Sequence, residues 1–284
     1  MNSSTLLGIT TFTYLFSTLL YVAVIVFRAP KIGKIATIFT ALAWIIQTGG
    51  LLLRWSESYQ MGIGHAPLTN MYESVVFFAW TIIILYLIIE IKFKTKVIGA
   101  FAVPFAFLAM AYASFSTDIS KTINPLVPAL QSNWLISHVV TCFVGYASFA
   151  VAAGLGIMYL FKHTSNSTSH ETADDRSTRL PSLQVLDSII HSTMVFGFIW
   201  LTAGIITGAV WANSAWGTYW SWDPKETWSL ITWFFYALTL HARYTRGWSG
   251  KPIAFLAIFG FVSVLFTYYG VNFLLSGLHS YGAG

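Results

Sequence analysis

The chain is built from apolar runs of about 20 residues, the length that a helix needs to cross a bilayer, separated by short polar segments. Hydrophobic residues make up 56% of the 284 residues and charged residues only 9%. This leaves too little polar surface to cover a water-soluble globule. The runs lack the alternation of barrel strands, and an isolated spanning segment satisfies its backbone only as a helix. The composition therefore predicts an all-α polytopic membrane protein.

Eight such runs are candidate membrane spans. We expect them at roughly 5–27, 33–53, 70–91, 97–116, 133–161, 186–210, 224–243 and 252–275. The first run has no basic region before it and no small-residue cleavage site, so we expect it to be retained and not removed as a signal peptide. The prediction is a single integral membrane domain over 1–284, with a Trp-rich connection at 211–228 and a polar connection at 162–182.

The basic residues are concentrated in alternate connections. Twelve of the fifteen Lys and Arg residues fall in the first, third, fifth and seventh connections, and only Arg54, Lys121 and Lys225 fall in the others. Connections on the inner side of a membrane carry the excess of positive charge. We therefore expect both termini and the Trp-rich connection on the outer side, and 162–182 on the inner side. The net charge of +5 then reflects topology and not nucleic-acid binding.

The segment Trp216–Trp228 places four tryptophans within thirteen residues. Such a cluster could be an aromatic belt at the membrane interface, or a surface on which a flat apolar ligand such as a porphyrin stacks. In the same segment, Asp223, Pro224 and Glu226 have the spacing of a capped helix start. Capping explains the two acidic residues without a ligand, and a role in binding such a ligand is the alternative that the sequence leaves open. Lys225 is either solvated or paired with a carboxylate of the ligand.

Cys142 is the only cysteine, and it lies inside an apolar run. One cysteine allows no disulfide within the chain, no thiolate cluster and no Cys-x-x-Cys-His heme attachment segment. The chain is therefore not itself a c-type cytochrome. We expect Cys142 to be a small apolar filler.

Four histidines are candidate ligands. On the predicted topology His65, His138 and His279 lie on the outer side. Two outer histidines from distant parts of a chain can supply both axial nitrogens of one iron, although each can also bond to backbone at the interface. His241 lies seventeen residues beyond Pro224, about 26 Å along a helix. It is thus either a functional histidine near the inner side of the hydrocarbon layer or a hydrated helix end.

Two segments resemble one known family. The run Trp-Gly-x-x-Trp-x-Trp-Asp-x-Lys-Glu, which begins at Trp216, resembles the WWD motif of the heme-handling membrane proteins that assemble c-type cytochromes. The segment Gly64–Ser74 is similar to the CcsA/ResC subunit of the system II cytochrome c synthase. The resemblance extends roughly from His65 to His279.

The resemblance implies roles for the candidate residues. In that family two outer histidines flank the motif and ligate heme b, and the matching positions here are His138 and His279. His241 would ligate heme at an inner site, with the second ligand from a partner subunit, and His65 would line the heme pocket. The motif residues implied in heme binding are Trp216, Gly217, Trp220, Trp222, Asp223 and Trp228.

The implied function is cytochrome c biogenesis. Heme would be moved to the outer face and joined through thioether bonds to the Cys-x-x-Cys-His segment of an apocytochrome c, with the protein positioning the heme. Synthase activity is expected only with a ResB-like partner subunit, in a bacterial inner membrane or, if plastid-encoded, a thylakoid membrane. The alternatives are a system I heme-delivery protein, a membrane b-type cytochrome and a transporter without an attachment step. Eight spans and the segment Gly64–Ser74 favour system II.

Overall fold

The structure, a computed structural model, describes residues 2–166, 180–275 and 277–278, and all regular secondary structure in these residues is helical. The helices are α1 (Ser3–Phe27), α2 (Pro30–Gln60), α3 (Met71–Phe93), α4 (Gly99–Phe115), η1 (Pro128–Leu130), α5 (Asn133–Asn166), α6 (Leu183–Trp216), α7 (Pro224–Arg246), α8 (Lys251–Leu265), η2 (Phe266–Gly270) and α9 (Val271–Leu274). Each predicted span overlaps one long helix, and the all-α polytopic fold is confirmed.

Six helices of the described residues are long and apolar enough to cross a membrane. They are α1, α2, α3, α5, α6 and the continuous helix Lys251–Leu274, which α8, the π-helical turn η2 and α9 form together. Helix α4 is apolar but has only 17 residues. Helix α7 has 23 residues and carries more polar side chains. The protein is an integral membrane protein.

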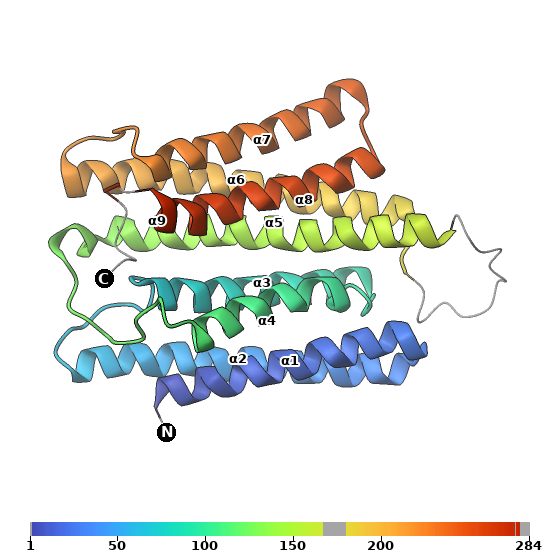
Figure 1. Ribbon diagram of the computed structural model, residues 1–284, viewed down its shortest axis with the longest axis horizontal. Helices are drawn as coiled ribbons and strands as arrows, with labels where there is room; N and C mark the ends of the chain where they lie inside the picture. Colours follow the sequence, from blue (N-terminus) through green and yellow to red (C-terminus); the bar gives the residue numbers. More distant parts are fainter. Residues whose placement is uncertain (1, 167–179, 276, 279–284) are drawn as a thin grey trace.

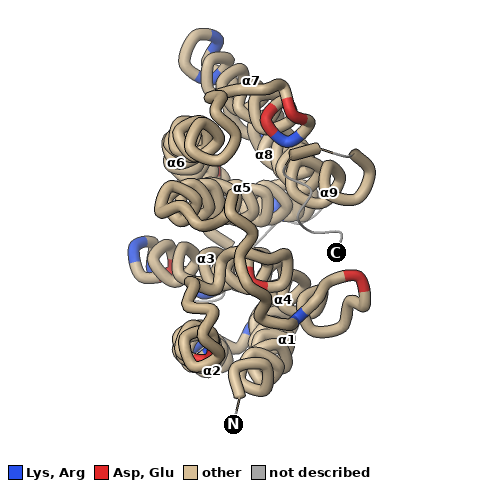
Figure 2. Tube along the Cα trace, turned by 90° about the vertical axis from the view of Figure 1, so that its left-hand side faces the viewer, with Lys and Arg blue, Asp and Glu red and all other residues tan. Residues whose placement is uncertain are grey.

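Successive long helices run in opposite directions along the long axis of the molecule (Figure 1). The start of α1, the end of α9 and the α6–α7 connection therefore lie at one end, and the α1–α2, α3–α4 and α7–α8 turns lie at the other. Figure 2, which looks along the bundle, shows how few charged residues its helices carry. The predicted grouping of connections by end agrees with the fold, and the membrane side that each end faces stays a prediction.

Helix α5 lies at the centre and packs on α3, α4, α6 and α8. A Cβ on Gly145 would lie 3.0 Å from a backbone nitrogen of α6. A Cβ on Gly154 would lie 2.3 Å from a backbone oxygen of α4, and one on Gly156 would lie 2.7 Å from a backbone oxygen of α8. Three neighbouring helices thus approach α5 so closely that only glycine fits, as is common where helices pack inside membranes.

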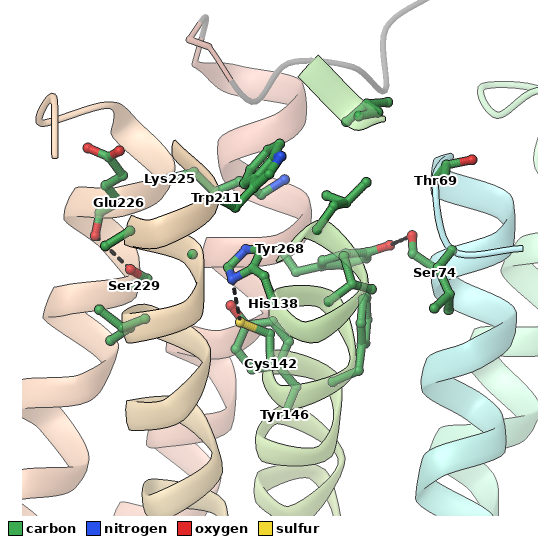
Figure 3. Close-up of a pocket in the computed structure, with 18 of the residues that line it drawn as sticks. Thr69, Ser74, His138, Cys142, Tyr146, Trp211, Lys225, Glu226, Ser229 and Tyr268 are labelled. Carbon is green, nitrogen blue, oxygen red and sulfur yellow. Dashed lines mark hydrogen bonds between the residues drawn. The ribbon is translucent and has the colours of Figure 1, made fainter. Parts of the chain in front are cut away.

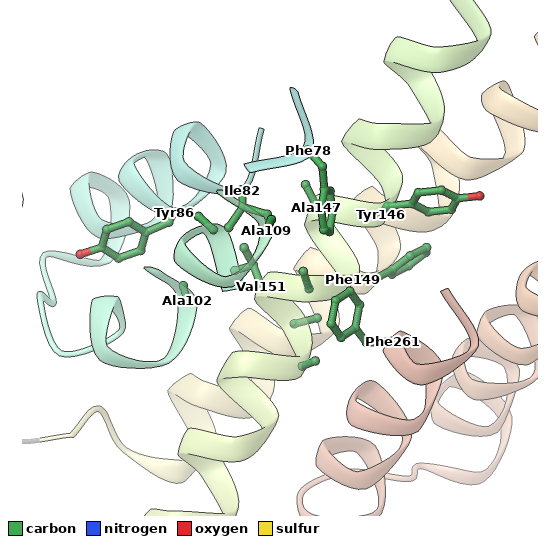
Figure 4. Close-up of a cluster of buried hydrophobic side chains, with 14 of the residues drawn as sticks. Phe78, Ile82, Tyr86, Ala102, Ala109, Tyr146, Ala147, Phe149, Val151 and Phe261 are labelled. Carbon is green, nitrogen blue, oxygen red and sulfur yellow. The ribbon is translucent and has the colours of Figure 1, made fainter. Parts of the chain in front are cut away.

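The core between the two halves of the bundle combines large rings with alanines (Figure 4). Phe78 of α3 and Ala147 of α5 are buried there, and Phe261 of α8 approaches from the other side. The rings of Phe149 and Tyr236 stack with their centroids 3.6 Å apart. Alternating large and small side chains let the helices interlock, which fixes the rotation of α5 and hence the side chains that it presents at its ends.

The connections at the α6–α7 end are tied together by a buried ion pair. Arg54 of α2 and Glu73 of α3 are both almost fully buried, and Arg54 Nε lies 2.8 Å from Glu73 Oε1. Arg54 also donates to the carbonyl of Lys121, in the α4–α5 connection. Removing one partner would leave the other charge buried and unpaired, so the pair holds α2, α3 and this connection in one arrangement.

Accessibility labelling tests the predicted orientation. Thr218 and Ser249 are exposed and lie at opposite ends of the bundle. In a Cys142→Ala background, we expect a cysteine at Thr218 to react with a membrane-impermeant maleimide added to intact cells. A cysteine at Ser249 should react only after permeabilisation, because the basic end faces inward. The cysteine-free protein is the control, and the reverse pattern would contradict the orientation.

Candidate functional site

A cavity of about 170 Å³ lies at the α6–α7 end of the bundle (Figure 3). Helices α3, α5, α6, α7, η2 and α9 all contribute to it, together with the α6–α7 connection. Its polar and aromatic lining includes Ser74, His138, Trp211, Trp220, Lys225 and Tyr268. Residues from both halves of the chain therefore converge on one apolar cavity with a few polar groups, which is the usual form of a ligand site.

His138 projects from α5 into this cavity (Figure 3). Its Nδ1 lies 2.8 Å from the carbonyl oxygen of Gly204 on α6. Because a carbonyl only accepts, Nδ1 carries the hydrogen, and in the neutral ring Nε2 then holds the lone pair. Proteins commonly hold metal-binding histidines in this way, with the second ring nitrogen donating to a backbone carbonyl. The ring also stacks on Trp211, with centroids 5.7 Å apart and planes at 17°.

Two glycines of α6 make room for this arrangement. A Cβ on Gly208 would lie 2.6 Å from Nδ1 of His138, and a Cβ on Gly204 would lie 2.6 Å from Sγ of Cys142. Cys142 lies one turn along α5 from His138, and its sulfur is 3.6 Å from the same Nδ1. The sequence analysis missed both glycines. Their Gly-x-x-x-Gly spacing within an apolar run is the signal that could have found them.

The predicted Trp-rich connection at 211–228 includes the end of α6 and the start of α7. Helix α6 ends at Trp216, and Gly217 caps it in the left-handed conformation, with φ 79°. Helix α7 begins after Asp223 with a complete capping box between Asp223 and Glu226. The predicted cap is confirmed. The connection proper is the segment 217–223, which we call the Trp loop.

The four tryptophans of the motif point in different directions. Trp220 lines the cavity. Trp222 meets it edge-on, with centroids 5.7 Å apart, and is 68% exposed. Trp216 packs edge-on against Trp211 at 4.8 Å, and Trp228 packs at 4.2 Å on an aromatic ring of η2. Of these four only Trp220 lines the cavity, and the contribution of Trp211, outside the motif, was missed.

Trp211 is held in place by the α4–α5 connection. Its indole N–H donates to the carbonyl of Ala129 in η1, at 2.9 Å. This hydrogen bond and the stack on His138 fix the plane of the indole over the cavity. Trp211 therefore links the position of the α4–α5 connection to the orientation of the histidine.

Asp223 also contacts the end of the chain. Its Oδ2 accepts a hydrogen bond from the backbone N–H of Leu278, at 2.5 Å. A Cβ on Gly277 would lie 2.3 Å from the same oxygen. Residues 277–278 are thus held against the Trp loop. His279 lies outside the residues that the structure describes, and its pairing with His138 stays a prediction.

The other two candidate histidines lie away from the cavity. His65 is buried, with Nε2 3.1 Å from the carbonyl of Asn124, so it braces two connections. The cavity lining begins three residues later, at Leu68. His241 is exposed on α7 at the opposite end of the bundle. His191 contacts Tyr244, with Nε2 3.1 Å from the hydroxyl.

The backbone at Trp222 predicts an unusual response to mutation. Its φ is 60°, a left-handed conformation that costs a bulky residue about 1–2 kcal/mol. Trp222→Gly relieves this cost but increases the freedom of the unfolded chain. We therefore expect the free energy of unfolding of the Trp222→Gly variant to stay within about 1 kcal/mol of the wild-type value. Trp216→Gly, inside the last turn of α6, should lower stability by at least about 1 kcal/mol.

Thermal unfolding in one detergent measures both variants. A loss in Trp222→Gly as large as that in Trp216→Gly would show that the exposed ring of Trp222 serves the fold.

Known proteins resemble the chain over most of its length. Residues 68–279 match the family described as Cytochrome C assembly protein. The chain is 40% identical over 274 residues to the cytochrome c biogenesis protein CcsA of Prochlorococcus marinus (strain MIT 9303), covering 88% of this chain and 85% of that protein. It is 41% identical over 294 residues to CcsA of Guillardia theta, covering 97% and 95%. It is also 41% identical over 290 residues to CcsA of Pyropia yezoensis, covering 89% of each.

The fold also resembles a solved structure, that of the cytochrome c heme lyase CcmF, with a TM-score of 0.71 and 15% sequence identity. The match covers 98% of this chain and 48% of that one, so the chain spans about half the length of that protein. At this identity the similarity concerns the fold alone. The family predicted from the two motifs is confirmed by the sequence comparisons: the chain belongs to the cytochrome C assembly protein family.

Proposed function

We propose that this protein binds heme b in the cavity beside the Trp loop and presents it for covalent attachment to an apocytochrome c. Its family, and relatives named for cytochrome c biogenesis, support a role in that process. The observation that carries the heme site is His138. Its Nδ1–H is engaged by the Gly204 carbonyl, and its ring faces an apolar cavity between Trp211 and Trp220.

The size of the cavity supports binding of one edge of the porphyrin. A volume of about 170 Å³ is below the roughly 300–1,000 Å³ of pockets that enclose a small molecule. The ligand would therefore enter by an edge, with the rest at the open mouth, where Tyr219 is 61% exposed. Such partial exposure suits a heme whose vinyl groups must be reached by the thiols of another protein.

In this proposal the chain positions the heme, and the apocytochrome supplies the nucleophilic thiols. Each thioether bond forms when a cysteine S–H of the apocytochrome adds across a vinyl double bond, with sulfur on one carbon and hydrogen on the other. His138 would hold the iron, while Gly204 and Trp211 hold the imidazole. Trp220 would offer its ring to the porphyrin face. These residues fix the heme relative to the incoming cysteines, which makes the reaction effectively intramolecular.

We assign the attachment activity to a complex with a ResB-like subunit, as in the system II synthase. The exposure of His241 supports a complex of two subunits. Its ring lies on the surface of α7, where a partner subunit could supply the second ligand of a heme iron. Heme would be received near His241 and then ligated at the outer end by His138 and His279. The membrane is a bacterial inner membrane or, in a plastid, the thylakoid membrane.

Axial ligation is tested by three variants. His138→Ala should abolish cytochrome c maturation, and added imidazole should partly restore it by taking the empty axial position. Gly208→Ala keeps the histidine but fills its place, so heme content should fall several-fold and the optical spectrum should change. Ile206→Ala, exposed on the same helix, is the control. Heme staining of cytochrome c and spectra of the purified protein are the measurements, and normal maturation in His138→Ala would refute the assignment.

The order of the two heme sites is tested by comparing His241→Ala with His138→Ala. If heme arrives through the inner site, His241→Ala should deplete heme from the whole protein. His138→Ala should retain more heme, with an altered spectrum. His191→Ala, which removes the contact with Tyr244, serves as the control at the same end of the bundle. Equal heme content and identical spectra in the first two variants would show that His241 does not act upstream.

A further inference from the structure

The cavity is lined by a lysine that forms no ion pair with the residues that the structure describes. Lys225 lies in the first turn of α7 and lines the cavity. Its Nζ donates to Oδ1 of Asn272 at 2.7 Å and lies 5.9 Å from the centre of the Tyr268 ring. Ion pairs within the described residues occur at three other places, and Lys225 takes part in none of them. Its ammonium group therefore faces a neutral amide and an aromatic ring.

The nearest carboxylates in the sequence are committed to backbone groups. Asp223 accepts from the backbone N–H of Lys225 and from that of Leu278. Glu226 Oε2 accepts from the backbone N–H groups of Ser221 and Asp223, at 2.8 and 3.1 Å. These bonds cap α7 and shape the Trp loop. Neither carboxylate forms an ion pair with the lysine.

A second donor lines the same cavity. The indole Nε1 of Trp220 is buried and has no hydrogen-bond partner among the described residues. Asn272, which accepts from the lysine, is held by its own amide, which donates to the Tyr268 carbonyl at 2.7 Å. This bond presents Asn272 Oδ1 to the ammonium. A buried donor without an acceptor and a buried cation without an anion both cost free energy unless a ligand supplies the missing group.

We propose that Lys225 Nζ and Trp220 Nε1 form a carboxylate-binding subsite of the cavity, which takes a propionate of the bound porphyrin. The inference rests on the proposed function, because the ligand is the heme that His138 would hold. A lysine ammonium and an indole N–H are both donors, and a carboxylate accepts from both while it neutralises the cation. Figure 3 shows Lys225 on the same side of His138 as Trp211, toward the end of the helices.

The subsite determines the rotation of the porphyrin about its axial bond. The two propionates of heme lie on the edge opposite the two vinyl groups. A propionate held at Lys225 therefore directs the vinyl edge away from α7. The subsite selects the edge of heme that an incoming apocytochrome meets, a task that axial ligation by a histidine alone does not perform.

Optical titration of the purified full-length protein with heme and with heme dimethyl ester, which lacks both carboxylates, tests the subsite. The wild type should bind heme at least about 10-fold more tightly than the diester, a difference of about 1.4 kcal/mol. Lys225→Met should bind the two equally, with the axial-ligand spectrum unchanged. Lys225→Arg should keep the preference because it keeps the charge. Trp220→Phe, which keeps a ring without the N–H, should lose part of it.

Lys121→Met is the matched control, because Lys121 is an exposed lysine at the same end of the bundle. It should retain the wild-type preference. An unchanged preference in Lys225→Met, or equal binding of both ligands by the wild type with a histidine-ligated spectrum, would overturn the subsite and leave the proposed function standing. A wild type that binds neither ligand through histidine would overturn the proposed function itself.

Discussion

The site depends on the close approach of α5 and α6. Inside a membrane the lipid is as apolar as the helices, so close packing and hydrogen bonds must hold them together. Gly145 and Gly204 allow the two backbones to approach, and Gly208 leaves the space that His138 occupies. The same approach brings the Gly204 carbonyl to Nδ1 of His138. One packing contact therefore positions the histidine and selects its tautomer.

The connections around the cavity are joined to this helix pair by a few buried interactions. The Arg54–Glu73 pair holds α2 and α3 and reaches the α4–α5 connection. That connection accepts the indole N–H of Trp211, which stacks on His138. On the other side, Asp223 caps α7 and accepts the N–H of a residue beyond α9. Segments far apart in the chain thus share one hydrogen-bonded frame around the cavity.

Several features that cost stability lie at the cavity end. Trp222 is exposed and has a left-handed backbone. Among the described residues, the Trp220 indole N–H has no hydrogen-bond partner and Lys225 forms no ion pair. Local conflicts of this kind are typical of functional sites. The π-helical turn η2 belongs to the same group, because it interrupts a regular helix where Tyr268 lines the cavity.

The sequence alone determined the helices, the grouping of their ends, the cap at Asp223 and the family, because each depends on local pattern or a contiguous motif. It placed the end of α2 near residue 53, seven residues early, since it could not show that Arg54 and Glu57 pair with residues on other helices. Only the tertiary structure decided that the motif tryptophans diverge and that Trp211 and Lys225 share a cavity with His138. Those relations depend on how far each helix is rotated and how closely it approaches its neighbours, and contacts between distant segments set both.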